Sequence, residues 1–525
     1  MQPRRDDSQE AVFQFLQDPG THGISEPVIR IDTHGAVVFL AGPDVFKVKR
    51  AVRYAYMDFS TLTLRERACH AEILVNRSDP ADLYLGVLPI TRDHDGSLHL
   101  GGSGQVVEWT VHLKRFDEEA TLDRQAARGA VTPALIDALA GSVIAAHEAA
   151  PMRDATRATR LLKRQIGQTL DELASEPEIF PRQRTARLAS ALRRRLDELL
   201  PLLARRGVAG QVRRCHGDLH LGNVVVIDGL PILFDALEFD EDLATGDVLY
   251  DLAFLVMDLC MHGLVAEANR LLNGYLSLSA EQAPLIDGLA ALPLFLSVRA
   301  AIRAKVVAAS FRFHSDPARR ETALAYLSAA SEFMMPASPR LIAIGGLSGT
   351  GKTRLAAAVA PALGHKPGAI HLRSDVVRKH MAHAGLTTRL PAAEYEAGPS
   401  AAVYHSLGQL AERGLCAGQV VIADATYQDP TRRADIAKVA QQAGAAFQGL
   451  WLDAPLALRT ARIAARRGDA SDATEAVAIA QDAANLGGSS WRRLDASQPA
   501  GSLLQAALAA LQCTGSPTAP PARRR

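Results

Sequence analysis

Hydrophobic and polar positions follow two different patterns along the 525-residue chain. Over residues 28–113, short β-branched runs such as 36–40 and 45–49 are separated by Gly, Pro and Asp turn residues. These runs predict an antiparallel sheet, and the apolar spacing of residues 64–77 predicts one helix between its strands in the sequence. Helices are predicted at 132–206 and 247–334, with a short β region at 212–239 between them. Together with the sheet they predict an α+β domain with a small β lobe and a helical lobe.

After a Pro-containing break at residues 335–340 the pattern changes. Apolar runs at 340–344, 419–423 and 449–453 alternate with helical stretches. Strands alternating with helices predict an α/β domain with a parallel sheet covered on both faces. We therefore expect an N-terminal extension (1–24), a first domain (25–334), a linker (335–339), a second domain (340–513) and a Pro- and Arg-containing disordered tail (514–525).

Composition excludes several classes of protein. Lys and Arg total 58 against 57 Asp and Glu, so no global field attracts the chain to nucleic acid or anionic lipid. Five scattered cysteines without a CxxC pair argue for a reducing compartment and against disulfides or a zinc site. The N-terminus lacks a long apolar region, and Arg299, Arg303 and Lys305 interrupt the apolar stretch 289–311. We expect a cytoplasmic protein with no membrane partner.

The second domain contains a full GxxxxGK(S/T) phosphate-binding motif. An apolar strand precedes it and an alanine-rich helix follows, which argues against a Gly-rich turn without function. We expect Lys352 to reach the β- and γ-phosphates of ATP and Thr353 to offer its hydroxyl to Mg²⁺. The motif consists of Gly346, Leu347, Ser348, Gly349, Thr350, Gly351, Lys352 and Thr353.

Two further carboxylates suit phosphoryl transfer in this domain. Asp424 ends the strand 420–423, where it could hold the Mg²⁺ shell or only stabilise a turn. Asp375 and Arg378 lie three residues apart at a helix start. Asp375 could accept the proton of a substrate hydroxyl while Arg378 holds the substrate, or it could be only a helix cap.

Basic residues recur at spacings of three and four in the last third of the chain, which places Arg459, Arg462 and Arg466 on one helix face. Such a stripe is either a solvated face or a lid that neutralises charge in the transition state. We take Arg462 and Arg466 as candidate nucleotide contacts.

This part of the chain, over about 340–511, resembles the P-loop kinases of the gluconate-kinase and zeta-toxin type. The motif, the Asp375–Arg378 segment, Asp424-Ala-Thr426 and the segment from Arg466 to Ala473 carry the resemblance. It implies phosphorylation of a small hydroxyl compound.

The first domain contains His216-Gly-Asp218 followed by Asn223, and later Asp235. Phosphoryl transfer needs one carboxylate at the nucleophile and a separate carboxylate and amide oxygen on Mg²⁺. Asp218 and Asn223 suit the two ends of a catalytic loop, and Asp235, after a hairpin, suits the metal-holding aspartate. The alternative is a polar hairpin whose side chains only stabilise turns.

Over about residues 25–330 the chain resembles the aminoglycoside phosphotransferase family and, more loosely, the protein kinases. The resemblance implies a protein-kinase-like fold, with Asp218 as catalytic base, Asn223 and Asp235 as Mg²⁺ ligands and His216 ordering the loop. Asp247 and Asp251 look like acids that brace this loop, or they are only helix N-terminal acids.

The small lobe of such a fold supplies a lysine to ATP and a glutamate to hold that lysine. We favour the pair Lys49 and Glu72, and Lys47 remains an alternative. This sequence departs from the family pattern in two places. No GxGxxG loop precedes Lys47, so the turn 33–35 is the candidate for covering the ATP phosphates. In addition, Ala236 follows Asp235 where a glycine is usual.

Together, the two parts resemble bacterial bifunctional aminoglycoside phosphotransferase and ATP-binding proteins. We expect an ATP- and Mg²⁺-dependent phosphotransferase with two nucleotide sites and small-molecule acceptors, of undetermined oligomeric state. One alternative makes one domain a non-catalytic ATP-binding module that controls the other. A second alternative, a C-terminal polynucleotide 5′-hydroxyl kinase, is disfavoured because that domain offers few stacking aromatics besides Trp451 and Trp491.

Overall fold

A computed structural model describes residues 7–54, 57–76, 82–314, 317–466, 468–482 and 490–512. Cys513 and the tail 514–525 lie outside these ranges. The chain forms two compact units, each built from two segments. The first unit comprises Met1–Leu264 and Leu294–Ala330, and the second comprises Val265–Pro293 and Ser331–Arg525.

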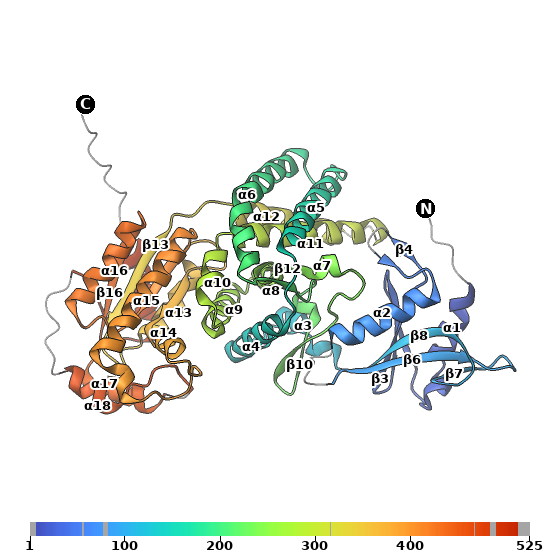
Figure 1. Cartoon of the computed structure of the whole chain (residues 1–525), viewed down its shortest axis with the longest axis horizontal. Helices are drawn as coiled ribbons and strands as arrows, with labels where there is room; N and C mark the ends of the chain where they lie inside the picture. The colour runs from blue at the N-terminus through green and yellow to red at the C-terminus, as the bar shows by residue number, and fades with distance from the viewer. Residues whose placement is uncertain are drawn as a thin grey trace. The chain divides into compact units, whose positions relative to one another are not determined.

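The first unit begins with a six-stranded antiparallel sheet, in the order β1-β2-β3-β8-β6-β7 (Figure 1). The predicted helix is α2, which lies between the third and sixth strands in the sequence. The bounds are β1 Ile29–Asp32, β2 Ala36–Ala41, β3 Asp44–Lys49, β4 Arg53–Tyr54, β5 Met57–Asp58, α2 Leu62–Val75, β6 Tyr84–Arg92, β7 Leu98–Leu100 and β8 Gln105–Lys114.

The two faces of β3 have different partners, because side chains alternate along a strand. Phe46 and Val48 face a core that includes Val12, Phe13 and Leu16 of α1 (Asp7–Gln17). The predicted N-terminal extension therefore contains a helix that completes the core of the small lobe. Lys47 and Lys49 point to the opposite face, where Glu72 of α2 meets them.

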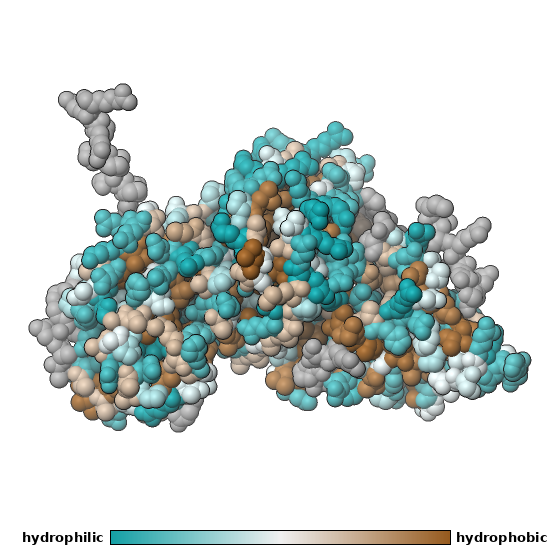
Figure 2. All heavy atoms as spheres, in the orientation of Figure 1, coloured by the Kyte–Doolittle hydropathy of each residue, from teal (hydrophilic) through white to brown (hydrophobic). Residues whose placement is uncertain are grey.

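The large lobe of the first unit is mainly helical, with one hairpin and one two-stranded ribbon. Long helices α5 and α6 expose mostly hydrophilic residues (Figure 2), whereas α8 is buried almost throughout. The elements are α3 Leu122–Ala127, α4 Pro133–Ala149, α5 Ala155–Ala174, α6 Arg182–Val208, β9 Val212–Arg214, β10 Val224–Ile227, β11 Leu230–Leu233, α7 Glu241–Ala244, β12 Thr245–Asp247, α8 Val248–Met261, α11 Leu292–His314 and α12 Pro317–Phe333.

The second unit contains the expected parallel sheet, with five strands in the order β14-β15-β13-β16-β17. The strand that precedes the phosphate-binding motif is central. The edge strands β14 and β17 were not predicted, because each has only four residues, two or three of them polar. The elements are β13 Arg340–Gly346, α13 Lys352–Val359, β14 Ile370–Arg373, α14 Ser374–Met381, α15 Ala397–Cys416, β15 Val420–Asp424, α16 Pro430–Gln442, β16 Ala446–Asp453, α17 Leu456–Ala464, α18 Glu475–Asp482, β17 Arg492–Asp495 and α19 Ala500–Gln512.

The boundary between the units differs from the predicted linker at 335–339. Helices α9 (Val265–Leu278) and α10 (Gln282–Gly288) precede that linker by some fifty residues, yet they belong to the second unit. Asp287 of α10 forms an ion pair of 2.6 Å with Arg413 of α15, and Gln419 donates to the Leu289 carbonyl at 3.2 Å.

Within the described ranges, no single helix is both long and apolar enough to cross a membrane, and one bent pair, Gln282–Gly288 with Leu292–Ala309, meets that test only jointly.

Candidate active sites

A tight hairpin brings Asn223 and Asp235 together in the first unit. β10 pairs with β11 in the register Val224↔Leu233, and the turn between them uses Asp228 and Gly229 at φ 50° and 79°. The residues that flank the paired strands must then be neighbours, and the Phe234 amide donates to the Asn223 carbonyl at 3.1 Å. Asp235 has φ 59°, a conformation that costs a non-glycine residue about 1–3 kcal/mol and that clusters at functional sites.

Asp218 lies at the other end of the same loop. The Asn223 side-chain amide donates to the Asp218 carbonyl at 2.9 Å and to its Oδ2 at 3.4 Å. His220 Nδ1 accepts from the Gly222 amide, so its Nε2 faces Asp218 Oδ2 at 3.5 Å. Desolvation raises the pKa of Asp218, but the hydrogen bond and charge of His220 overcome this and lower the pKa to about 2.

The backbone of this loop is held by Asp251 of α8. Its two carboxylate oxygens accept from the amides of Gly217 at 2.9 Å and His216 at 3.2 Å. The imidazole of His216 contacts the Phe234 carbonyl at 2.9 Å, which ties the loop to the hairpin. Asp247 has a different role, because it caps α8 at the Leu249 amide and pairs with Arg206 at 2.5 Å.

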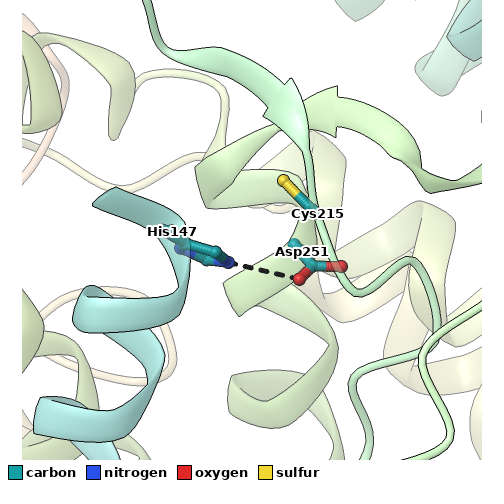
Figure 3. Close-up of side chains that lie close together, drawn as sticks. All are labelled: His147, Cys215 and Asp251. Atoms are coloured by element: carbon teal, nitrogen blue, oxygen red, sulfur yellow. Dashed lines mark hydrogen bonds and ion pairs between the residues drawn. The ribbon is translucent and has the colours of Figure 1, made fainter. Parts of the chain in front are cut away.

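Figure 3 shows His147, Cys215 and Asp251 converging behind the loop. Their ligand atoms lie within 4.8 Å of one another, which is close enough for a shared metal ion. Both Asp251 oxygens are already occupied, and the Arg299 guanidinium lies 3.7 Å from one of them. Burial also raises the pKa of the Cys215 thiol well above its usual range, so it stays protonated. The cluster therefore suits a brace, in which His147 contacts Asp251 at 3.2 Å, better than a cation site.

Two lysines share the buried carboxylate of Glu72. Lys47 Nζ lies 2.9 Å from Glu72 Oε1 and 2.6 Å from Asp235 Oδ1. Lys49 Nζ lies 2.5 Å from Glu72 Oε2 and also pairs with Glu238. The Lys49 side chain is 2% exposed and that of Lys47 is 18% exposed. The structure therefore places Lys47, not the favoured Lys49, beside the candidate metal ligand.

These lysines are charged despite their surroundings. Burial lowers the pKa of Lys47, but the charges of Asp235 and Glu72 outweigh it and raise the pKa well above its ordinary value.

The segment 33–35, the candidate for covering the ATP phosphates, is a turn, as predicted. Residues 33–35 connect β1 to β2, and the Thr33 and Ala36 backbones bond at 2.9 Å.

In the second unit, the phosphate-binding loop is shaped by its glycines. Gly346, Gly349 and Gly351 have φ of 146°, 85° and 92°. A Cβ at Gly349 would lie 2.5 Å from the Arg459 carbonyl, so only glycine fits. The loop leads directly into α13, whose N-terminus suits an anion.

Thr353 of α13 and Asp424 of β15 meet at the end of the sheet. Because β13 and β15 are parallel and pair Ile344 with Asp424, both strands end beside the loop. Thr353 Oγ1 donates to Asp424 Oδ2 at 2.6 Å, and His371 Nε2 contacts the same oxygen at 3.2 Å. Burial raises the pKa of Asp424, but His371 outweighs it and lowers the pKa to about 2.

A cavity of about 850 Å³ gathers the predicted residues of this unit. Burial has the largest effect on the Asp375 carboxyl and raises its pKa. The positive charge of Arg373 opposes this rise, and the negative charge of Asp424 adds a smaller increase. Burial lowers the pKa of Lys352. The predicted residues that line the cavity are Ser348, Gly349, Thr350, Gly351, Lys352, Thr353, Asp375, Arg378, Asp424, Arg462 and Arg466.

The arginine stripe divides into two roles. Arg459 is fully buried beneath the loop, where it contacts the Ser348 carbonyl at 3.4 Å and pairs with Asp482, so the solvated-face interpretation is wrong for this residue. Arg462 donates to the Thr350 carbonyl at 3.2 Å, and Arg466 lies 3.5 Å from Asp469.

Three residues of these sites were missed. His220 lies inside the recognised motif, and its neighbourhood could have suggested a role. Glu238 and His371 gave no signal, because each acts through a partner far away in the sequence.

Comparisons with known proteins also find two parts, but the first match continues through residues 265–292, which pack with the second unit. Residues 82–292 match the model of the phosphotransferase enzyme family, and residues 341–485 match the model of an AAA domain. The chain is 30% identical over 488 residues to uncharacterized proteins of Mycobacterium tuberculosis and Mycobacterium bovis, which covers 90% of this chain and 93% of each relative.

Two solved structures are similar to one part each. One is a choline/ethanolamine kinase family protein of Mesorhizobium loti, at 14% identity and TM-score 0.37, covering 62% of this chain and 94% of that one. The other is a gluconokinase of Sinorhizobium meliloti, at 18% identity and TM-score 0.25, covering 33% and 93%. Neither similarity identifies the phosphate acceptor. The chain is a phosphotransferase, and it belongs to the same family as the mycobacterial proteins with which it aligns over most of its length.

Proposed function

We propose that the chain has two nucleotide sites and that each transfers the γ-phosphate of ATP to a hydroxyl group of a small molecule. One observation carries this proposal: each unit places a metal-type carboxylate 2.6 Å from a second candidate residue of its nucleotide site, Asp235 from Lys47 and Asp424 from Thr353.

In the first unit, Asn223 and Asp235 would hold Mg²⁺. The donor set fits this ion, because Mg²⁺ prefers carboxylate and amide oxygens. The amide nitrogen of Asn223 is bonded to Asp218, which leaves its amide oxygen for a cation. The bound ion would neutralise charge on the phosphates.

The other residues of this site have separate roles. Lys47 would bind the ATP phosphates while Glu72 fixes its position. Asp218 would orient the acceptor hydroxyl and accept its proton as the new O–P bond forms. A carboxylate with a pKa of about 2 is ionised at neutral pH and suits such a late proton transfer.

In the second unit, the loop amides and Lys352 would hold the phosphates, and Thr353 and Asp424 would hold Mg²⁺. The Thr353 hydroxyl and the Asp424 carboxylate lie 2.6 Å apart, and both offer the oxygen ligands that this ion prefers. Asp375, whose pKa burial raises, would accept the acceptor's proton. Arg462 and Arg466 line the same cavity and would neutralise transition-state charge.

A screen of a metabolite library for ATP-dependent phosphorylation tests the proposal. It uses the full chain beside Asp218→Ala and Asp375→Ala. We expect each variant to lose a different set of products. If one variant retains every product of the wild type, its unit is a non-catalytic module and the two-site proposal fails.

A further inference from the structure

The edge strand β14 has a covered outer side. Among the strands that the structure describes it pairs with β15 alone, so the backbone groups on its other side have no strand partner there. Two asparagines of α9 take that place. Asn269 and Asn273 donate to the Ala369 carbonyl at 3.0 Å and 3.1 Å, and Asn273 Oδ1 accepts from the His371 amide at 2.7 Å.

The Asn273 side chain thus acts like the peptide group of a neighbouring strand. It offers one donor and one acceptor to two successive outward-facing groups of the edge. Asn269 and Asn273 are four residues apart, so they lie on one face of the helix. Asn269 is 3% exposed, and an amide buried to this degree is costly unless it is bonded.

The residue that Asn273 holds also reaches the proposed metal site. The His371 backbone amide bonds to Asn273, and its side chain contacts Asp424 at 3.2 Å. Asp424 in turn accepts from Thr353. The side chains of His371 and Asp424 are 7% and 4% exposed, so packing leaves them little freedom. A shift of the β14 backbone would therefore move the partner of Asp424.

Helix α9 has a second contact near the active site. The Ser277 carbonyl, close to the end of α9, lies 2.8 Å from His380 Nε2 on α14. The same helix α14 carries Asp375 in its first turn. One helix therefore touches the strand beside the metal carboxylate and the helix that presents the proposed base.

We propose that α9 positions the catalytic groups of the P-loop site, with Asn273 acting through His371 on Asp424. This inference rests on the proposed nucleotide site of the second unit. It makes Asn273 and His371 positioning residues that touch neither nucleotide nor acceptor. It also means that the P-loop site depends on residues 265–278, which precede its first strand by more than sixty positions.

The test uses the full chain carrying Lys47→Met and Asp235→Ala, so that the second site reports alone. We measure the Mg²⁺ concentration that half-saturates binding of a fluorescent ATP analogue, and the exchange rate of the His371 amide hydrogen. Loss of an outer-shell partner changes metal affinity by about 10–100-fold. Asn273 acts on such a partner, His371, only indirectly, so Asn273→Leu should raise the Mg²⁺ requirement several-fold. Affinity in EDTA should not change, and His371 should exchange at least about tenfold faster.

Two variants control for general damage to the helix. Ala266→Ser changes an exposed residue of α9 and should leave both readings at the wild-type value. Asn273→Asp keeps the acceptor for the His371 amide and removes the donor to Ala369. It should shift the Mg²⁺ requirement less than Asn273→Leu does, and it serves if the leucine variant unfolds.

A double-mutant comparison tests the route. If Asn273 acts through His371, then Asn273→Leu adds little to the shift caused by His371→Leu. Additive shifts, or a wild-type Mg²⁺ requirement in Asn273→Leu and Asn273→Asp, would overturn the inference. Failure of the proposed function gives a different result: Mg²⁺-dependent binding by the chain with Lys47→Met and Asp235→Ala would survive the further change Lys352→Ala.

Discussion

Lys47 Nζ lies 2.6 Å from Asp235 Oδ1 and 2.9 Å from Glu72 Oε1. One cation thus joins the helix of the small lobe to the loop that we propose holds Mg²⁺. Lys49, two residues away, forms its ion pairs deeper, with Glu72 and Glu238. The two lysines therefore have different roles, which substitution can separate.

Replacing Lys47 should affect chemistry more than folding. We expect Lys47→Met to lower kcat for products of the first site by about 10²–10³, the cost of losing one preorganised electrostatic contact. Lys49→Met leaves the buried Glu238 without its lysine, while Glu72 keeps Lys47, and should cost about 3–5 kcal/mol of unfolding free energy. Denaturant unfolding and kinetics on both variants check this. A stable Lys49→Met chain with the larger loss of kcat would reverse the assignment.

The two proposed bases should give the two sites different pH profiles. The pKa of Asp218 is lowered to about 2, whereas burial raises that of Asp375. A base must be deprotonated, so activity of the second site falls at a higher pH on acidification. Only the second site is active in Asp218→Ala, and only the first in Lys352→Ala. On acidification, we expect Asp218→Ala to lose phosphate transfer at a pH at which Lys352→Ala retains it. Identical acidic limbs would contradict these roles.

The brace at Asp251 should make the first unit sensitive to acid. Burial raises its pKa, but His147 outweighs this and lowers the pKa from 3.8 to about 2. A depressed folded pKa contributes stability above the unfolded pKa, and this is lost as pH falls from 3.8 through 2. The contribution is about 2 kcal/mol. Unfolding measured between about pH 5 and 2 should show a smaller pH dependence in Asp251→Asn; an unchanged slope would contradict the assignment.

Gly349 and Gly418 form a matched pair. Both have positive φ, 85° and 78°, so alanine is strained at either position. A Cβ at Gly349 would strike the Arg459 carbonyl at 2.5 Å, whereas one at Gly418 meets nothing within 4 Å. Gly418→Ala should therefore cost only the strain, about 1–3 kcal/mol, and keep nucleotide binding. Gly349→Ala should abolish nucleotide binding at the second site. Equal affinities in a titration would refute the steric argument.

Helix α1 should be needed for the small lobe to fold. Leu16 is fully buried in the core, so Leu16→Ala should cost about 2–5 kcal/mol of unfolding free energy. Gln14 lies exposed on the same helix, and Gln14→Ala should stay within about 0.5 kcal/mol of the wild type. Equal effects of the two substitutions would show that α1 does not belong to the core.

Local sequence signals predicted the parts of the fold that depend on near neighbours. The hairpin after Asn223 and the loop before Lys352 are set by turn residues within a few positions, so motif and context identified both. The two sheets, apart from strands β14 and β17, followed from the apolar runs and the turn residues between them. The choice between Lys47 and Lys49 did not, because both lie on one face of β3 and differ only in the acids they meet across the lobe.

Long-range packing explains what the sequence did not predict. Nothing in residues 265–293 indicates that they pack with the P-loop unit, since their amphipathic pattern suits any helical core. The asparagines at 269 and 273 are ordinary polar positions until β14 is placed beside them. Strands β14 and β17 were missed because an edge strand needs only a short apolar run.

Our main proposal is that one chain holds two nucleotide sites. A titration of the full chain with a non-hydrolysable ATP analogue and Mg²⁺, followed by calorimetry, counts them directly. We predict two molecules bound per wild-type chain, one after Lys352→Ala, one after the double change Lys47→Met with Asp235→Ala, and none when all three substitutions are combined. One molecule bound per wild-type chain, or a count that Lys352→Ala leaves unchanged, would contradict the proposal.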